Sequence, residues 1–357
     1  EFESDNTAHT NYANTERLLT LSFDSEEELI ANTVVITING REVTPSKTLS
    51  HNGEKESWAA TYDLGNVYAN DTDDDGGEGT IIPFTIDFDA TNGNSGEQVD
   101  ATSDASVVTY DETPPVAATL TIASNNDNDA SMCKVDDNVT VTFEAGEILQ
   151  QPTILIAGKA ISEVVGVTAA SWTGTLQMLE SDSEGILSIS VAFMDYAGNE
   201  GVTQLAKLSG DNVTFDKTVP TLSAVSISSN NTYNPDRATT ADVITLEIIA
   251  DNDPLHSSPI FTIDGDAVVP TTGDNGTTWT GAYIMQDDDT EAVVAFSIVF
   301  EDLAGNPGAT AQATLDETSV TFDKTATVMT GVVVALDSDS DTGVDDEDDL
   351  TNDVTPT

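Results

Sequence analysis

The chain repeats itself over a long distance. Residues 171–174 (Ser-Trp-Thr-Gly) return 107 positions later as residues 278–281 (Thr-Trp-Thr-Gly), and residues 213–218 (Val-Thr-Phe-Asp-Lys-Thr) return unchanged at 320–325. A less similar third copy precedes both, and in it Trp58 corresponds to Trp172 and Trp279. A period of about 105 residues predicts a series of separately folded domains. Because copying one catalytic pocket along a chain gains nothing, whereas reach and stiffness grow with each copy, the repeat favours a structural or adhesive protein.

The repeat also sets the predicted domain boundaries. We expect domains over residues 1–113, 114–218 and 219–326, followed by residues 327–357 as the first strand and acidic opening of a further repeat or tail. The first domain lacks most of its first strand and carries an acidic insert near residues 69–79.

The mismatch between the two ends supports two interpretations. If these are natural ends, the apolar segment 330–336 of one copy fills the gap in the next by strand donation. If the chain is cut from a longer array, the intact protein supplies both pieces in sequence. The continuation of residues 337–357 into what reads as another repeat favours the second interpretation.

The charge of the chain limits its partners. There are 64 acidic and 10 basic residues, for a formal charge of −54. Such a surface argues against nucleic acid or an anionic membrane surface as partner, and it favours cations. The sequence has no apolar run of 18 residues, so we expect no direct membrane insertion. Its self-repulsion is tolerable in a saline medium, which screens charge. With Cys133 as the only cysteine, disulfides cannot stabilise the domains.

The second copy shows the predicted fold. Val139, Val141 and Phe143 alternate with Thr140 and Thr142, which is typical of a strand with one buried face. Seven runs of strand chemistry without a helical period predict an all-β fold, a tandem immunoglobulin-like β-sandwich array of elongated form. The runs cover residues 117–122, 139–143, 153–157, 162–168, 171–178, 186–193 and 212–215.

The tryptophans invite a ligand-stacking interpretation. Trp58, Trp172 and Trp279 occupy equivalent positions of the three copies, on the strand face that we expect to be buried. A large apolar side chain repeated at one inward position favours a core role over ligand stacking.

Several strings resemble a known family. Residues 213–218 with Pro220, the opening 222–230 (Leu-Ser-Ala-Val-Ser-Ile-Ser-Ser-Asn) and the turn 302–306 (Asp-Leu-Ala-Gly-Asn) resemble the tandem Ig-like domains of prokaryotic surface-layer proteins and giant cell-surface adhesins. The resemblance covers essentially the whole chain. It implies an extracellular, cell-surface protein whose partners are other copies of itself or neighbouring repeats.

The acidic residues suggest calcium at the domain junctions. In an Ig topology, alternate loops gather at the two ends of each sandwich, so acids from neighbouring domains meet. Calcium takes about six to eight hard oxygen ligands, and bridging two domains in this way makes a mobile hinge rigid. The alternative is that Asp and Asn only shape turns. The candidate ligands at the junctions are Asp127, Asp129, Asp182, Glu184, Asp195, Asn199, Asp216, Asp251, Asp253, Asp302 and Asn306.

Two acidic strings are further calcium candidates. Residues 71–76 (Asp-Thr-Asp-Asp-Asp-Gly) resemble the first half of an EF-hand loop, but Ile82 stands where the bidentate Glu belongs. Residues 337–343 alternate carboxylates in the same way. The predicted ligands are Asp71, Asp73, Asp75, Asp337, Asp339 and Asp341.

Signals for chemistry are poor. His9, His51 and His256 fall at non-equivalent repeat positions, and no metalloprotease, nucleophile-elbow or phosphate-loop motif occurs. We therefore predict a non-catalytic protein, a surface-layer-type lattice or coat stabilised by cations. The alternatives are a calcium-rigidified adhesin stalk and a carbohydrate-binding module using Tyr68, Tyr233 or Tyr283.

Overall fold

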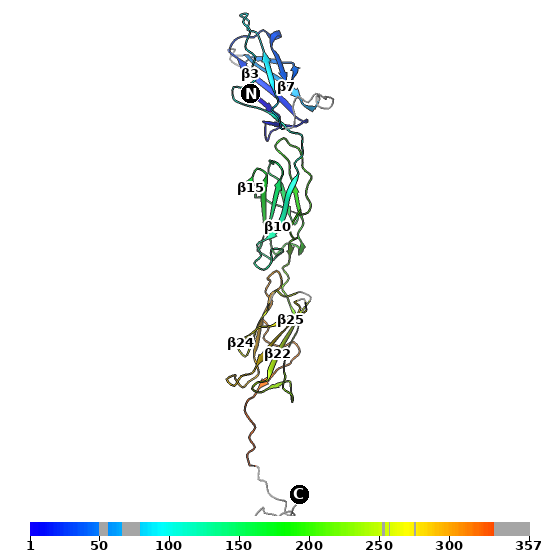
Figure 1. Ribbon diagram of the computed structural model, residues 1–357, viewed down its shortest axis with the longest axis vertical. Helices are drawn as coiled ribbons and strands as arrows, with labels where there is room; N and C mark the ends of the chain where they lie inside the picture. Colours follow the sequence, from blue (N-terminus) through cyan, green and yellow to red (C-terminus); the bar gives the residue numbers. More distant parts are fainter. Residues whose placement is uncertain (50–55, 66–78, 252–253, 257, 275, 332–357) are drawn as a thin grey trace, which may run out of the picture. The chain divides into compact units, whose positions relative to one another are not determined.

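A computed structural model (Figure 1) describes residues 1–49, 56–65, 79–251, 254–256, 258–274 and 276–331. The chain divides into two units: unit 1 contains residues 1–220 and 301–308, and unit 2 contains residues 221–300 and 309–357. Unit 1 holds two hydrophobic cores and unit 2 holds one. We name the strands around these cores sandwich 1 (β1–β9), sandwich 2 (β10–β19) and sandwich 3 (β20–β28). The domain boundaries given above stay predictions.

Sandwich 2 has the strand order of an immunoglobulin domain. One antiparallel sheet runs β10-β12-β16-β15 and the facing sheet runs β14-β13-β18, which correspond to the A-B-E-D and C′-C-F orders of that fold. A small third sheet joins β11 in parallel to β19, and β19 to β17. The strands are β10 (Ala117–Ser124), β11 (Met132–Cys133), β12 (Asn138–Ala145), β13 (Thr153–Ile156), β14 (Lys159–Ala160), β15 (Val164–Thr168), β16 (Ser171–Gln177), β17 (Gly185–Ile186), β18 (Ile189–Ala192) and β19 (Thr214–Phe215).

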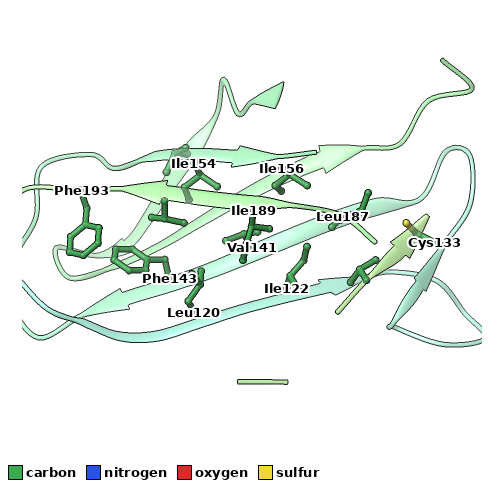
Figure 2. Close-up of a cluster of buried hydrophobic side chains, with 14 of the residues drawn as sticks. Leu120, Ile122, Cys133, Val141, Phe143, Ile154, Ile156, Leu187, Ile189 and Phe193 are labelled. Carbon is green, nitrogen blue, oxygen red and sulfur yellow. The ribbon is translucent and has the colours of Figure 1, made fainter. Parts of the chain in front are cut away.

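The core of sandwich 2 follows from the alternation seen in the sequence. Val139, Val141 and Phe143 of β12 are fully buried, whereas Thr140 and Thr142 between them are only partly buried. Figure 2 shows side chains of both sheets, among them Leu120, Ile122, Ile154 and Ile156, gathered between the strands. The rings of Phe143 and Phe193 lie 4.8 Å apart. Burial of this apolar surface is the main stabilising contribution.

One predicted strand is wrong. Residues 186–193 form two strands, because the chain changes partner between them: β17 pairs with β19 of the small sheet and β18 pairs with β13. Leu187, Ile189 and Val191 are all buried, so the apolar alternation continues across the change of partner and the sequence gives no sign of it. The parallel pairing of β11 with β19 was not predicted either.

The other two sandwiches repeat the same topology. Their larger sheets run β1-β3-β7-β6 and β20-β22-β26-β25, and their smaller sheets run β5-β4-β8 and β24-β23-β27. The chain is therefore an all-β protein of tandem Ig-like sandwiches. Sandwich 1 contains β1 (Phe2–Ser4), β2 (Tyr12–Ala13), β3 (Leu18–Ser25), the 3-10 helix η1 (Ala31–Thr33), β4 (Val35–Ile38), β5 (Arg41–Val43), β6 (Ser46–Leu49), β7 (Glu56–Asp63), β8 (Phe84–Asp87) and β9 (Thr109–Tyr110). Sandwich 3 contains β20 (Leu222–Ser229), β21 (Arg237–Ala238), β22 (Val243–Ala250), β23 (Ile260–Ile263), β24 (Asp266–Val268), β25 (Thr271–Asp274), β26 (Thr278–Ile284), β27 (Phe296–Val299) and β28 (Thr321–Phe322).

The tryptophans belong to the cores. Trp58 and Trp279 are buried, and Trp172 is partly buried against the core of sandwich 2. Each lies opposite a large apolar residue of the neighbouring strand, namely Phe23, Phe143 or Ile248. The core interpretation of the repeated tryptophan is confirmed.

Candidate metal site between the first two sandwiches

The turn that follows β18 is closed by its own side chains. The Asp195 carboxylate accepts hydrogen bonds from the backbone amides of Gly198 (2.7 Å) and Asn199 (2.9 Å) and from the Asn199 side-chain amide (2.8 Å). Asp195 is 1% exposed. Gly198 has a φ of +99°, a conformation that favours glycine. Residues 195–199 (Asp-Tyr-Ala-Gly-Asn) therefore form a turn whose shape depends on the Asp195 and Asn199 side chains.

The same turn holds sandwich 1 against sandwich 2 within unit 1. The Asn199 side-chain amide donates to the backbone carbonyl of Asp111 (2.9 Å), and its oxygen accepts from the Asn14 side-chain amide (2.9 Å). The Asn6 amide donates to the Tyr196 carbonyl (2.8 Å), and the His9 ring stacks on the Tyr196 ring with centroids 3.7 Å apart. The joint between the two sandwiches is therefore built from direct contacts.

Three carboxylates meet beside this turn. Oxygen atoms of Asp111, Glu147 and Asp195 lie within 4.8 Å of one another, with Asp195 buried and the other two partly buried. Asp111 leaves sandwich 1, while Glu147 and Asp195 belong to loops of sandwich 2. Three like charges at this spacing repel one another, and a cation between them removes the repulsion. Carboxylate oxygens are the ligands that calcium prefers, and three carboxylates supply up to six.

Unit 1 contains a second turn of the same construction. The Asp302 carboxylate, fully buried, accepts from the backbone amide and the side-chain amide of Asn306, both at 2.9 Å. The Asn306 amide also donates to the backbone carbonyl of Asp216 (3.1 Å), the counterpart of the bond from Asn199 to Asp111. Lys134 and Asn126 bind the backbone of this turn at Gly305 and Ala304. The junction chemistry is thus repeated along with the sequence.

Asp216 sits in an unfavourable place for its charge. Burial raises its pKa above the ordinary value, and the neighbouring carboxylates of Asp302 and Glu184 raise it further. The folded chain therefore holds this proton more tightly than the unfolded chain does. The stability that Asp216 contributes through this bound proton is fully present below the ordinary pKa of aspartate. It is lost as pH rises through the higher pKa of the folded state.

Replacing Asp216 by a neutral isostere tests this directly. We expect Asp216→Asn to raise the melting temperature of unit 1 at about pH 7 without divalent cations, and to leave it unchanged near pH 3, where aspartate is largely protonated in both states. Calorimetry at the two pH values is the measurement. The matched control is Asp211→Asn, because Asp211 is exposed. An equal effect of both substitutions at neutral pH would show that only net charge matters.

The calcium ligands predicted from the sequence divide into three groups in the structure. Asp195, Asn199, Asp216, Asp302 and Asn306 lie in the two turns or on the chain that these turns bind. Asp127, Asp129 and Asp251 are exposed, and the Asp129 carboxylate accepts from Ser131. The Asp182 carboxylate accepts from the Lys159 amino group, and the Glu184 carboxylate accepts from the Thr218 hydroxyl. They do not belong to the convergent acidic group. Seven predicted ligands fall outside the described residues, namely Asp71, Asp73, Asp75, Asp253, Asp337, Asp339 and Asp341.

Sequence reasoning missed Asp111 and Glu147. Asp111 could have been found from the sequence, because residues 108–113 align with residues 213–218 and Asp111 then corresponds to Asp216. Glu147 lies in the loop after β12, which matches the loop after β22 that contains Asp251. Applying the junction argument to the first two copies as well as to the last two would have found both residues.

The aromatic residues considered for carbohydrate binding do not form a common surface where they are described. Tyr233 is 97% exposed, whereas the Tyr283 hydroxyl donates to Asp266 (2.9 Å) and Asp289 (3.0 Å) on a partly buried ring. Burial raises the pKa of Tyr283, and these acidic acceptors raise it further. Tyr68 lies outside the described residues.

Comparisons with known proteins assign neither a family nor a function to this chain. No family model matches the sequence, and no curated protein matches it. Among solved structures, the I9–I11 tandem from titin is 12% identical, over 88% of this chain and 96% of that one, with a TM-score of 0.31. Fibronectin(III)-like modules of Clostridium thermocellum CbhA are 9% identical over 57% and 95%, with a TM-score of 0.31. An ICAM-5 ectodomain fragment is 12% identical over 88% and 75%, with a TM-score of 0.30.

TM-scores this low carry no argument about this chain. Its fold class, a tandem array of Ig-like sandwiches, follows from the strand order of its own sheets. Among the described residues, no helix has the length and apolar character to cross a membrane.

Proposed function

We propose that this chain is a non-catalytic structural component of an extracellular cell-surface coat of the surface-layer type, with calcium at its domain junctions. The observation that carries the proposal is the repeated junction. Asn199 binds the Asp111 carbonyl and Asn306 binds the Asp216 carbonyl in the same way, so unit 1 contains the same turn and the same bond twice. A binding or catalytic module has no need of a reproduced joint, whereas a mechanical array depends on it.

The charge of the protein supports the cation part of the proposal. With a formal charge of −54, the surface attracts cations from the medium and repels anions. At the joint of unit 1, the convergence of Asp111, Glu147 and Asp195 offers a cation hard oxygen ligands from both sandwiches. An ion bound there links the sandwiches in addition to the amide hydrogen bonds.

Calcium is expected to stabilise unit 1. An ion that binds only the folded state stabilises it by about 2.7 kcal/mol at a free concentration one hundred times its Kd. We therefore expect a higher melting temperature with calcium and a lower one after chelation with EDTA. Calorimetry of the full chain at constant ionic strength is the measurement.

A double variant assigns the effect to the site. Asp111→Asn with Glu147→Gln removes two carboxylates but keeps the Asp195 turn, so it should abolish the calcium response. The control, Asp211→Asn with Glu163→Gln, removes the same charge from exposed positions and should keep it. An equal loss in both pairs, or no response in the original chain, would contradict a calcium site at this junction.

The arrangement of the native material tests the coat itself. A lattice requires lateral, symmetric contacts between copies, whereas the stalk of an adhesin shows only contacts from end to end. Electron microscopy of the native cell surface should show a regular two-dimensional array that contains this chain. Isolated filaments that carry a distal domain would instead identify a stalk.

A further inference from the structure

The charge after one hairpin turn differs among the three sandwiches. In each smaller sheet a tight turn joins two antiparallel strands, and both of its residues have a positive φ. These turns are residues 39–40, 157–158 and 264–265. The next residue is Arg41 in sandwich 1, Lys159 in sandwich 2 and Asp266 in sandwich 3. Sandwich 3 therefore has an acidic residue where the other two have a basic one.

In sandwich 2 the basic residue holds the hairpin to a neighbouring loop. The Lys159 amino group donates to the Asp182 carboxylate, which also accepts from the backbone amide of Leu179 (2.9 Å). The hydrogen bond from Lys159 holds the pKa of Asp182 below its ordinary value. The β13–β14 hairpin and the loop after β16 are thus joined by opposite charges.

In sandwich 3 a tyrosine lies between two carboxylates at the same place. Asp289 corresponds to Asp182 at the repeat offset of 107 residues, and it accepts from the backbone amide of Gln286 (2.6 Å). The Tyr283 hydroxyl lies 2.9 Å from an Asp266 oxygen and 3.0 Å from an Asp289 oxygen. A phenolic hydroxyl has one proton, so it can donate to only one of the two carboxylates at a time. The second contact becomes a hydrogen bond only when a carboxyl group supplies another proton.

A third carboxylate adds to the negative charge. Burial raises the pKa of Asp264 above its ordinary value, and the carboxylates of Asp289 and Asp266 raise it further. A hydrogen bond from the Thr290 amide acts in the opposite direction. Within the described part of the chain, no basic side chain forms an ion pair with these three carboxylates. The Lys324 amino group donates instead to the backbone carbonyls of residues 287 and 289. The other charged residues of the loop after β26 and of the chain beside it are Asp287, Asp288, Glu291 and Asp323.

We propose that Asp264, Asp266, Tyr283 and Asp289 act together as a proton-binding group, which takes up one proton and makes sandwich 3 more stable in a mildly acidic medium than in a neutral one. The proton reduces the repulsion among the carboxylates and completes the second hydrogen bond at the Tyr283 hydroxyl. It thus joins the β23–β24 hairpin to the loop after β26, as the Lys159 ion pair joins the matching elements of sandwich 2. Because the carboxylates interact, the proton belongs to the group and not to a single residue. The proposal does not depend on calcium or on the surface-layer assignment.

The same position therefore responds to pH in opposite ways in two sandwiches. In sandwich 3 the folded state binds the proton more tightly than the unfolded chain does. The stability contributed by the group is complete below the ordinary pKa of aspartate, about 3.9, and is lost as pH rises through the higher folded-state value. In sandwich 2 the pKa of Asp182 is lowered, so the stability contributed by the ion pair is complete above the ordinary pKa and is lost as pH falls through the folded-state value.

Amide hydrogen exchange of the full chain, resolved by segment and corrected for its intrinsic dependence on pH, provides the test. The experiment uses EDTA and constant ionic strength, so that the proton is the only ligand whose concentration changes. We expect the protection of β23 and β26 to rise by about twofold or more between about pH 7 and about pH 5. The Asp266→Lys variant, which copies Lys159, should be better protected at neutral pH and should lose this rise. Asp266→Asn should also lose it, because an amide supplies a proton to the hydroxyl at every pH.

The matched control is Asp288→Lys, which makes the same change of charge at an exposed position of the loop after β26 and should keep the rise. No rise in the original chain, a rise that persists in either Asp266 variant, or an equal loss in the Asp288→Lys chain would each overturn the proposal. Carbon NMR of the aspartate carboxyl groups supplies a second measurement. One carboxyl group of the three should titrate above about pH 5, roughly one unit above the ordinary value, and the absence of such a titration would also overturn the proposal.

Discussion

Trp279→Ala is expected to lower the free energy of unfolding of sandwich 3 by about 3–5 kcal/mol, the usual cost of deleting a buried tryptophan. Trp279 is 6% exposed, lies opposite Ile248, and donates its indole N–H to the Gly276 carbonyl at 3.0 Å. The substitution therefore leaves a cavity in the core and removes a hydrogen bond.

The measurement must separate the sandwiches, because a chain with several cores does not unfold as one two-state unit. Hydrogen exchange resolved by segment is suitable, with the loss of protection expected in β22 and β26 and not in β12 and β16. Tyr233→Ala is the control, since Tyr233 is 97% exposed and its replacement should change stability by less than about 0.5 kcal/mol. A stable Trp279→Ala variant that has lost binding to a glycan would restore the carbohydrate-binding hypothesis.

Asn199→Ala is expected to cost about 2–4 kcal/mol in unit 1. The side-chain amide donates to the Asp111 carbonyl and to the Asp195 carboxylate and accepts from Asn14, so three hydrogen bonds are lost and the buried Asp195 carboxylate loses a donor. Because Asn14 and Asp111 belong to sandwich 1, we also expect the two sandwiches to move more freely against each other.

Calorimetry gives the stability of the Asn199→Ala variant, and spin labels placed on sandwich 1 and sandwich 2 give the spread of distances between them. Asn212→Ala serves as the control, since Asn212 is exposed. If Asn199→Ala melts like the original chain and keeps a narrow distance distribution, the joint does not depend on this amide.

The fold was predictable because the signals that determine it are local. Alternation in residues 139–143 gave the buried face of β12, and the repeated tryptophan gave the core position of Trp58 and Trp279. The division of residues 186–193 into two strands was not predictable, because the apolar pattern continues while the hydrogen-bonding partner changes. That change is set by the pairing of β17 with β19, a contact between distant parts of the sequence.

The candidate site was predictable only in part for a similar reason. The Asp195 and Asp302 turns are read from a five-residue string, since each carboxylate binds backbone groups three or four residues ahead. The convergence of Asp111 and Glu147 on Asp195 depends on how two sandwiches meet. No spacing within one repeat predicts this convergence, although the correspondence of Asp111 with Asp216 indicated that Asp111 lies near a junction.

The bonds from Asn199 and Asn306 have a consequence for how such chains change over generations. Each asparagine binds a backbone carbonyl of the preceding segment, a group that every amino acid provides. The residue that supplies the carbonyl can therefore have any side chain and still accept this bond, whereas the asparagine that donates it is part of its own turn. This bond therefore survives when a gene segment encoding one sandwich is duplicated or exchanged, whereas the bond from Asn14 to Asn199 and the stacking of His9 on Tyr196 require particular side chains in the neighbour.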